Sequence, residues 1–151
     1  MGNRAVITTP EKEVGLYLHW NGGPESVCAF LTYAKAYGVR DPQGDKAYFF
    51  ARLCQITGNF LGGTLSCGID AYEHCDTDNG DNGTYIVGAG LDVIKRLYDM
   101  GANEKRKESY MRDFLKEINE RMGVNKLSDE DLHILDEVSF VSVPGFKITG
   151  D

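Results

Sequence analysis

Residues 14–24 read VGLYLHWNGGP, a strand pattern that runs through a turn into the start of a helix. Every second residue from Val14 to Trp20 is apolar, and this two-residue period is typical of a strand with one buried face. Asn-Gly-Gly then breaks the strand, and Pro24 suits the first turn of a helix. The stretch therefore predicts a half-buried strand that is followed directly by a helix.

The patterns on either side of this stretch extend it into a domain that contains both strands and helices. Further strands are expected at residues 4–9, 65–71 and 84–87, helices at 24–37, 45–61 and 104–122, a last helix from Ser128, and an edge strand at 140–143. Residues 91–98 fit either a strand or two turns of helix. Because strands and helices occur in separate runs, the fold class is α+β: a small antiparallel sheet with two packed helices, plus a C-terminal helical extension.

The length of the chain, 151 residues, corresponds to one domain. A Gly-containing segment near residue 100 separates the mixed part of the chain from the helical part. We therefore expect an α+β core domain at residues 1–100 and a helical extension, packed on that core, at residues 101–151.

The charge of the chain limits the classes of partner that it can have. Sixteen Lys and Arg residues against 23 Asp and Glu residues give a net charge of -7. Residues 63–100 alone carry two basic and seven acidic side chains, a net -5. Strong direct nucleic-acid binding needs basic surface, so it is not expected.

Hydropathy gives an expectation about location. No run of 18 apolar residues is present, so no membrane span is expected, and residues 1–7 lack the pattern of a signal peptide. We therefore expect a cytoplasmic protein whose four cysteines stay reduced.

The turn after the first quoted strand is one candidate binding segment. It places an imidazole, an indole and a side-chain amide beside a Gly-rich turn and a helix N-terminus: His19, Trp20, Asn21, Gly22 and Gly23. Exposed backbone N–H groups at such a turn could hold an anion. The structural alternative is that Trp20 continues the buried face of the strand and that Asn-Gly-Gly is simply a turn.

The second candidate segment is an acidic, Gly-rich loop at residues 76–83. Oxygen ligands of the kind that bind Ca²⁺ or Mg²⁺ are concentrated there: Asp76, Asp78, Asp81 and Asn82. The spacing does not match an EF-hand, and the same residues also favour an unligated turn. The segment therefore predicts either a divalent-cation site at Asp76, Asp78 and Asp81 or an acidic surface for a basic partner.

The sequence gives only weak signals for zinc binding and for nucleophilic catalysis. Zinc could be held by Cys67, His74 and Cys75 with Cys54 or Cys28, but no C-x-x-C pair is present. Cys28 and His19 are candidates for a nucleophile pair only on the strength of their residue types. Because common hydrolase, metalloprotease and dinucleotide motifs are missing, no catalytic residue is assigned, and a non-enzymatic role is favoured.

Three segments together carry a family resemblance: GNRAVI at residues 2–7, YLHWNGG at 17–23 and DTDNGDNGTY at 76–85. The Gly-bounded residues 58–63 fit the same pattern. Over residues 2–96 the chain resembles small proteins encoded by bacteriophages, prophages and mobile elements of bacteria. The resemblance implies a context, accessory proteins that include inhibitors of host defence such as anti-CRISPR proteins, and no particular reaction.

Three functional hypotheses follow. The leading hypothesis is a stoichiometric protein–protein inhibitor of a bacterial defence nuclease, with a Cas effector as an example of the partner. The second is a small-molecule or nucleotide-binding protein that sequesters or degrades a signalling nucleotide in a pocket between residues 19–23 and 76–83. The third is an accessory protein whose fold is stabilised by a metal ion.

Overall fold

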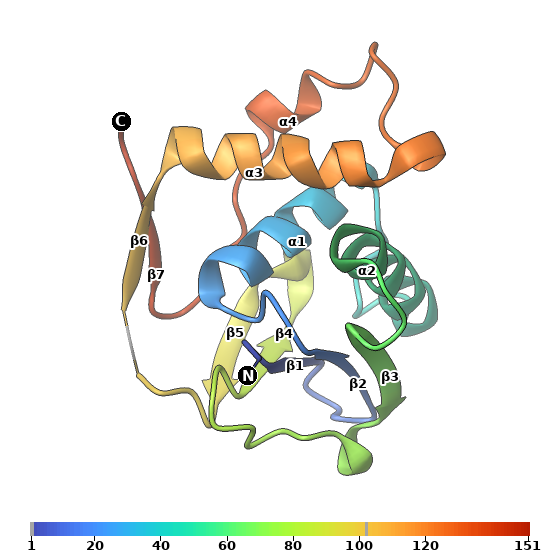
Figure 1. Ribbon diagram of the computed structural model, residues 1–151, viewed down its shortest axis with the longest axis vertical. Coiled ribbons are helices and arrows are strands. Elements are labelled where there is room, and N and C mark those ends of the chain that lie inside the picture. Colours follow the sequence, from blue (N-terminus) through green and yellow to red (C-terminus); the bar gives the residue numbers. More distant parts are fainter. Residues whose placement is uncertain (1, 102) are drawn as a thin grey trace.

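A five-stranded sheet with helices packed on one face forms the body of the molecule (Figure 1). The structure is a computed structural model that describes residues 2–101 and 103–151. The strands of this sheet are β1 (Ala5–Thr8), β2 (Val14–Leu18), β3 (Cys67–Ala71), β4 (Thr84–Val87) and β5 (Val93–Leu97). Their order is β3-β2-β1-β4-β5, with β1 and β4 parallel and the other neighbours antiparallel. The predicted α+β class is confirmed, and one parallel pair lies at the centre of a mostly antiparallel sheet.

Two helices cover one face of the sheet, and both begin and end close to the predicted positions. They are α1 (Pro24–Tyr37) and α2 (Lys46–Leu61). Pro24 begins α1, and Gly38 ends it in the left-handed conformation, at φ 90°. The Asp45 side chain accepts a hydrogen bond from the Tyr48 N–H and so caps α2. These local signals explain why the sequence locates both helices.

The C-terminal part contains two strands at positions that differ from the prediction of a helical extension with an edge strand at residues 140–143. Its elements are β6 (Glu104–Lys107), α3 (Glu108–Arg121), α4 (Ile134–Glu137) and β7 (Phe146–Thr149), and short 3-10 helices lie at Tyr72–His74, Ala89–Leu91 and Gly123–Asn125. Strands β6 and β7 pair in parallel in a separate two-stranded sheet. Residues 104–107 were expected to begin a helix, but they form a strand because they pair with β7, about forty residues later in the chain. Local periodicity does not reveal such long-range pairing.

Two other C-terminal predictions are wrong. The helix expected from Ser128 forms only at α4, because turns precede it and Arg112 donates to the carbonyls of Leu135 and Val138 at its end. The edge strand expected at residues 140–143 does not join a sheet ladder. The Val141 N–H instead donates to Thr32 Oγ1 at 3.1 Å, and one backbone bond runs from the Val93 N–H of β5 to the Ser142 carbonyl at 2.8 Å. The ambiguous residues 91–98 contain strand β5.

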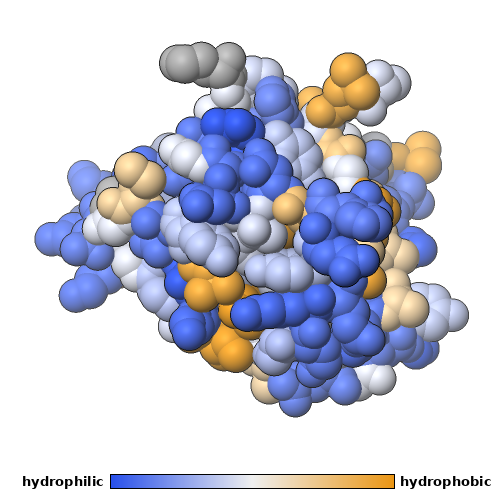
Figure 2. All heavy atoms as spheres, turned by 90° about the horizontal axis from the view of Figure 1, so that it is seen from below, coloured by the Kyte–Doolittle hydropathy of each residue, from blue (hydrophilic) through white to orange (hydrophobic). Residues whose placement is uncertain are grey.

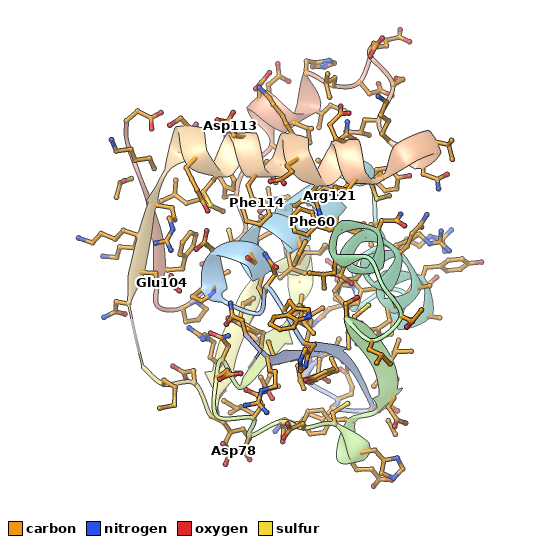
Figure 3. All side chains as sticks on the ribbon, in the orientation of Figure 1. Phe60, Asp78, Glu104, Asp113, Phe114 and Arg121 are labelled. Carbon is orange, nitrogen blue, oxygen red and sulfur yellow. The ribbon has the colours of Figure 1, made fainter. Side chains whose placement is uncertain are left out.

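One hydrophobic core joins the two parts of the chain. The cluster of buried side chains includes Phe30 and Leu53 from the first part and Met111, Leu115 and Val141 from the second. Figure 3 shows Phe60, Phe114 and Arg121 gathered where α1, α2 and α3 meet. The rings of Phe60 and Phe114 stack with their centroids 5.6 Å apart. The division at residue 100 therefore marks a change in sequence pattern within one continuous core.

The opposite face of the sheet is covered by the segment between β3 and β4. This segment must cross from the edge of the sheet to its centre, and it runs below the strands in Figure 1. A Cβ atom on Gly15 would lie 2.6 Å from Cys75 Sγ, so the segment lies directly against β2. Within the described residues no helix is both long and apolar enough to cross a membrane.

Candidate functional site

The two segments singled out by the sequence meet at one end of the five-stranded sheet, where β1 and β4 begin and β2 ends. Asn3 connects them. Its N–H donates to the His19 carbonyl at 2.9 Å, and its side-chain oxygen accepts from the Asn82 amide. Asn82 also donates to the Arg4 carbonyl at 3.2 Å. The first residues of the chain therefore hold His19 and Asn82 in one surface.

Arg4 is the principal partner of the acidic loop. Its Nε and its backbone N–H both donate to Asp81 Oδ2, at 2.8 and 3.1 Å. Asp76 lies farther away, with 3.8 Å between its Oδ2 and Arg4 Nη1. The hydrogen bonds from Arg4 lower the pKa of Asp81 below its ordinary value. Asp81 thus anchors the loop to β1.

Asn79 orders the interior of the same loop. Its side chain is buried, and Nδ2 donates to the carbonyls of Asp76 and Gly83 at 3.0 and 3.1 Å. Its Oδ1 accepts from the N–H groups of Asp81 and Gly83 at 3.1 and 3.0 Å. One amide therefore satisfies four backbone groups, and it gives the acidic loop a defined shape without a bound ion.

The described residues do not support the cation site or the zinc site. No group of three or more His, Cys, Asp or Glu side chains that could hold a metal ion occurs in residues 2–101 and 103–151. Asp81 is paired with Arg4, while Asp78 lies at the bottom of the molecule and points away from it (Figure 3). The three carboxylates of Asp76, Asp78 and Asp81 therefore do not converge.

Trp20 does not continue the buried face of β2, so the part of the structural alternative that buries Trp20 is wrong. The strand ends at Leu18, and Asn21 adopts a left-handed conformation at φ 55°, which turns the chain away from the sheet. Trp20 is 45% exposed and lies edge-on against His19, with 4.7 Å between the ring centroids. His19 Nδ1 is hydrogen-bonded to the Tyr17 hydroxyl at 2.8 Å. His19 and Trp20 thus form a small aromatic surface beside the loop.

The Asn-Gly-Gly turn has a structural role in the described residues. The Gly22 N–H donates to the Asn3 carbonyl at 2.8 Å, and the Gly22 carbonyl accepts from the Tyr85 hydroxyl at 2.7 Å. A Cβ at Gly22 would lie 2.5 Å from the Asn3 oxygen, so only glycine fits. The Gly23 carbonyl accepts from the Val27 N–H. The Gly22 N–H is thus occupied and Pro24 has no N–H, so two of the donors that an anion at this turn would need are missing.

The surroundings of the turn also differ from the pocket that the nucleotide hypothesis requires. Glu25 follows in the first turn of α1, and its carboxylate pairs with Arg106 at 2.6 Å. A negative side chain thus already occupies the helix N-terminus. The hollow beside His19 and Trp20, of about 580 Å³, is lined by residues 61–66 rather than by residues 76–83.

Cys28 is the cysteine that the sequence offers as a nucleophile with His19. Cys28 is buried in α1 and donates to the Val141 carbonyl at 3.5 Å, with Thr32 also nearby. Burial raises the pKa of the Cys28 thiol to about 12, so it remains protonated and unsuited to nucleophilic attack. His19 is hydrogen-bonded to Tyr17 instead. The proposed Cys28–His19 pair is therefore not formed.

A group of exposed carboxylates lies along the end of β3 and the segment below the sheet. We call Asp70, Glu73, Asp76 and Asp78 the acidic face. All four side chains are exposed. The imidazole of His74 lies among them, with its ring nitrogens 3.6 Å from carboxylate oxygens of Asp70 and Glu73. Figure 2 shows the underside of the molecule, most of which is covered by hydrophilic residues.

An apolar groove beside the acidic face was not predicted from the sequence. It has a volume of about 560 Å³ and lies between α2 and the outer strand β3. It is lined by Val14, Lys46, Ala47, Phe50, Ala51, Cys54 and Ile69. Ile69 is 51% exposed at its rim. The alternation of residues 65–71 gave a signal for a strand, but it did not reveal that the helix leaves part of this strand uncovered.

Comparisons of the chain with known protein families, with curated proteins and with solved structures found no match. The geometry of the acidic face, the ordered loop and the groove therefore carries the functional argument.

Proposed function

We propose that this chain is a non-catalytic inhibitor encoded by a bacteriophage or mobile element, and that it acts in the bacterial cytoplasm. It binds a bacterial defence nuclease, such as a Cas effector, in a stoichiometric complex. The resemblance of residues 2–7, 17–23 and 76–85 to proteins of mobile elements supports the choice of partner class.

The segregation of charge is the observation that carries the proposal. Residues 53–94 contain six Asp or Glu residues and no Lys or Arg. Asp81 is paired with Arg4. Among the described residues, the basic neighbours of the acidic face are Arg4, 3.8 Å from Asp76, and the His74 imidazole, 3.6 Å from Asp70 and Glu73. A nuclease that holds RNA and DNA must present basic surface, and the acidic face complements such a surface.

The rigidity of the loop supports a binding role. Asn79 and Arg4 fix the backbone around the exposed carboxylates before any partner arrives. A preorganised surface loses less conformational entropy when it binds, so more of the interaction free energy appears as affinity. Carboxylates held in this way also attract a basic partner over a distance and increase the association rate at low salt.

The test is a target-cleavage assay with a Cas9–guide RNA complex. Increasing amounts of the protein are added before the target DNA. A variant with a neutralised acidic face carries Asp70→Asn, Glu73→Gln, Asp76→Asn and Asp78→Asn. We expect the parent protein to inhibit cleavage and this variant to need at least a tenfold higher concentration, because four favourable charge interactions are removed.

A matched control neutralises four carboxylates elsewhere: Asp113→Asn, Asp129→Asn, Glu130→Gln and Glu137→Gln. All four are exposed, and Asp113 lies on α3 at the opposite end of the molecule from Asp78 (Figure 3). This control should inhibit as well as the parent. Equal inhibition by all three proteins would remove the acidic face from the proposal, and no inhibition of this or other defence nucleases would remove the function.

A further inference from the structure

Strand β3 has a free edge. It is the outer strand of the sheet, and in the part of the chain that the structure describes it pairs only with β2 (Figure 1). The Ser66 carbonyl accepts from the His19 N–H, and the Tyr72 N–H donates to the Glu13 carbonyl. In an antiparallel ladder the intervening residues of the same parity, Gly68 and Asp70, also direct their backbone groups toward β2. The backbone N–H and C=O groups of Cys67 and Ile69 therefore point outward.

Side-chain surfaces of opposite character flank this edge. On the helix face, the groove beside Ile69 is lined mostly by apolar side chains, and its one cation, Lys46, is paired with Glu13 at 2.6 Å and Glu11 at 3.4 Å. On the other face, a hollow of about 370 Å³ is lined by Tyr17, Gly68, Ile69, Asp70, His74, Cys75 and Asp76. Two members of the acidic face thus lie directly below the strand edge.

Together these features specify the chemistry of an added strand. A strand that paired with β3 would direct alternate side chains to the two faces of the sheet. One set would enter the apolar groove, and the other would meet Asp70 and Asp76. We infer that the open edge of β3 docks an extended partner segment in which apolar residues alternate with Lys or Arg. Main-chain hydrogen bonds then give affinity, and the two surfaces give specificity.

A second copy of this chain is a poor occupant of the same edge. Pairing β3 with its own copy would bring two acidic faces together, and like charges placed close together oppose association. A basic segment instead meets exposed carboxylates whose only Lys or Arg partner among the described residues is Arg4, 3.8 Å from Asp76. The inference rests on the proposed function in one respect, namely that the molecule acts by binding a protein.

The test measures backbone amide hydrogen exchange by NMR, with a synthetic peptide as the probe. The peptide is acetyl-Lys-Val-Lys-Ile-Lys-Val-Lys-amide, and a control peptide has proline in place of its central isoleucine. At saturation with the first peptide, exchange at Cys67 and Ile69 should slow at least tenfold, because their outward N–H groups become hydrogen-bonded. Gly68 and Asp70, which already bond β2, should change much less.

Two variants of the protein test this surface: the first changes the strand edge together with the groove-lining Ile69 side chain, and the second changes the groove alone. Ile69→Pro removes the outward N–H without removing a ladder bond to β2, and proline is accepted at such edge positions. Ala51→Arg fills the groove from α2, where Ala51 is exposed. Each variant should keep the thermal unfolding temperature of the parent within a few degrees and bind the peptide at least tenfold more weakly. The four-residue control variant described above should bind as the parent does.

Several results would overturn the docking inference. These are absence of peptide binding, equal binding of the proline peptide, or unchanged exchange at Cys67 and Ile69 in the complex. Slow exchange at these two amides in concentrated free protein, lost on dilution, would assign the edge to a second copy instead. Nuclease inhibition that survives both Ile69→Pro and Ala51→Arg would also reject this surface while leaving the proposed function intact. Peptide binding without any nuclease inhibition would reject the proposed function while leaving the docking surface intact.

Discussion

Asn79 shows how a single residue defines the candidate site. Its amide bonds four backbone groups of the loop at residues 76–83, and it is almost completely buried. Polar groups that lose their partners inside a protein are costly, because water cannot replace the lost bonds. The shape of the acidic loop therefore depends on this side chain rather than on a metal ion.

Replacement of Asn79 by alanine should lower the free energy of unfolding by about 2–3 kcal/mol, since buried backbone groups of the loop lose their partners. Urea denaturation followed by circular dichroism measures the change. Asn82→Ala is the control, because Asn82 is partly exposed and should cost only about 1 kcal/mol. Equal losses in the two variants would contradict the role given to Asn79.

The Asp81–Arg4 pair predicts a dependence of stability on pH. Because the folded pKa of Asp81 is lowered, the pair stabilises the fold fully above the unfolded pKa of about 4 and loses this contribution as pH falls through the folded value. Asp81→Asn should therefore destabilise the protein more at pH 7 than at pH 3. Urea denaturation at both pH values checks this, with the exposed Asp78→Asn as control. A difference independent of pH would show that the charge of Asp81 is not what matters.

The residues of the site could be found in the sequence, but their roles could not. An oxygen-rich loop with three carboxylates is consistent with a cation site, and the sequence alone does not show that Arg4, 77 positions earlier, pairs with Asp81. Trp20 was placed in the core as one alternative because alternation continues to it. The left-handed conformation of Asn21 ends that alternation, and alternation alone does not reveal it.

At the scale of elements, the sequence correctly predicts the helices whose ends are determined by nearby residues. Helices α1 and α2 follow from apolar spacing, Pro24, Asp45 and the terminal glycines. Strand β6 was missed because its stability comes from pairing with β7, far along the chain. Its place against α1 is fixed by Arg106, which bonds Glu25 and Glu104, while the Tyr110 hydroxyl donates to Glu25 at 2.7 Å.

The shared core predicts the behaviour of a shortened chain. A protein that ends at Met100 would expose the apolar side of α1 that Met111, Leu115 and Ile118 cover in the complete chain. It should lose fixed tertiary packing, which near-ultraviolet circular dichroism and binding of a hydrophobic dye would detect. The complete chain is the reference. Cooperative unfolding of residues 1–100 alone would contradict this expectation, because it would show that they form a domain that folds without residues 101–151.

At the scale of the whole molecule, the two faces of the sheet have different roles, one in the core and one at the surface. The helical face builds the core, and the crossover on the opposite face (Figure 1) carries the exposed carboxylates of Glu73, Asp76 and Asp78. This arrangement makes binding, rather than chemistry, the central claim of the proposed function. A binder and an enzyme differ in how many partner molecules each copy can inactivate.

The most direct measurement is therefore the equivalence point of inhibition. A Cas9–guide RNA complex is held at a concentration well above the dissociation constant, and the protein is titrated until cleavage stops. The account predicts a linear loss of cleavage that ends near one chain per effector complex. Complete inhibition at a small fraction of an equivalent, increasing with time, would show catalysis, and undiminished cleavage at a large excess would reject this effector as the partner.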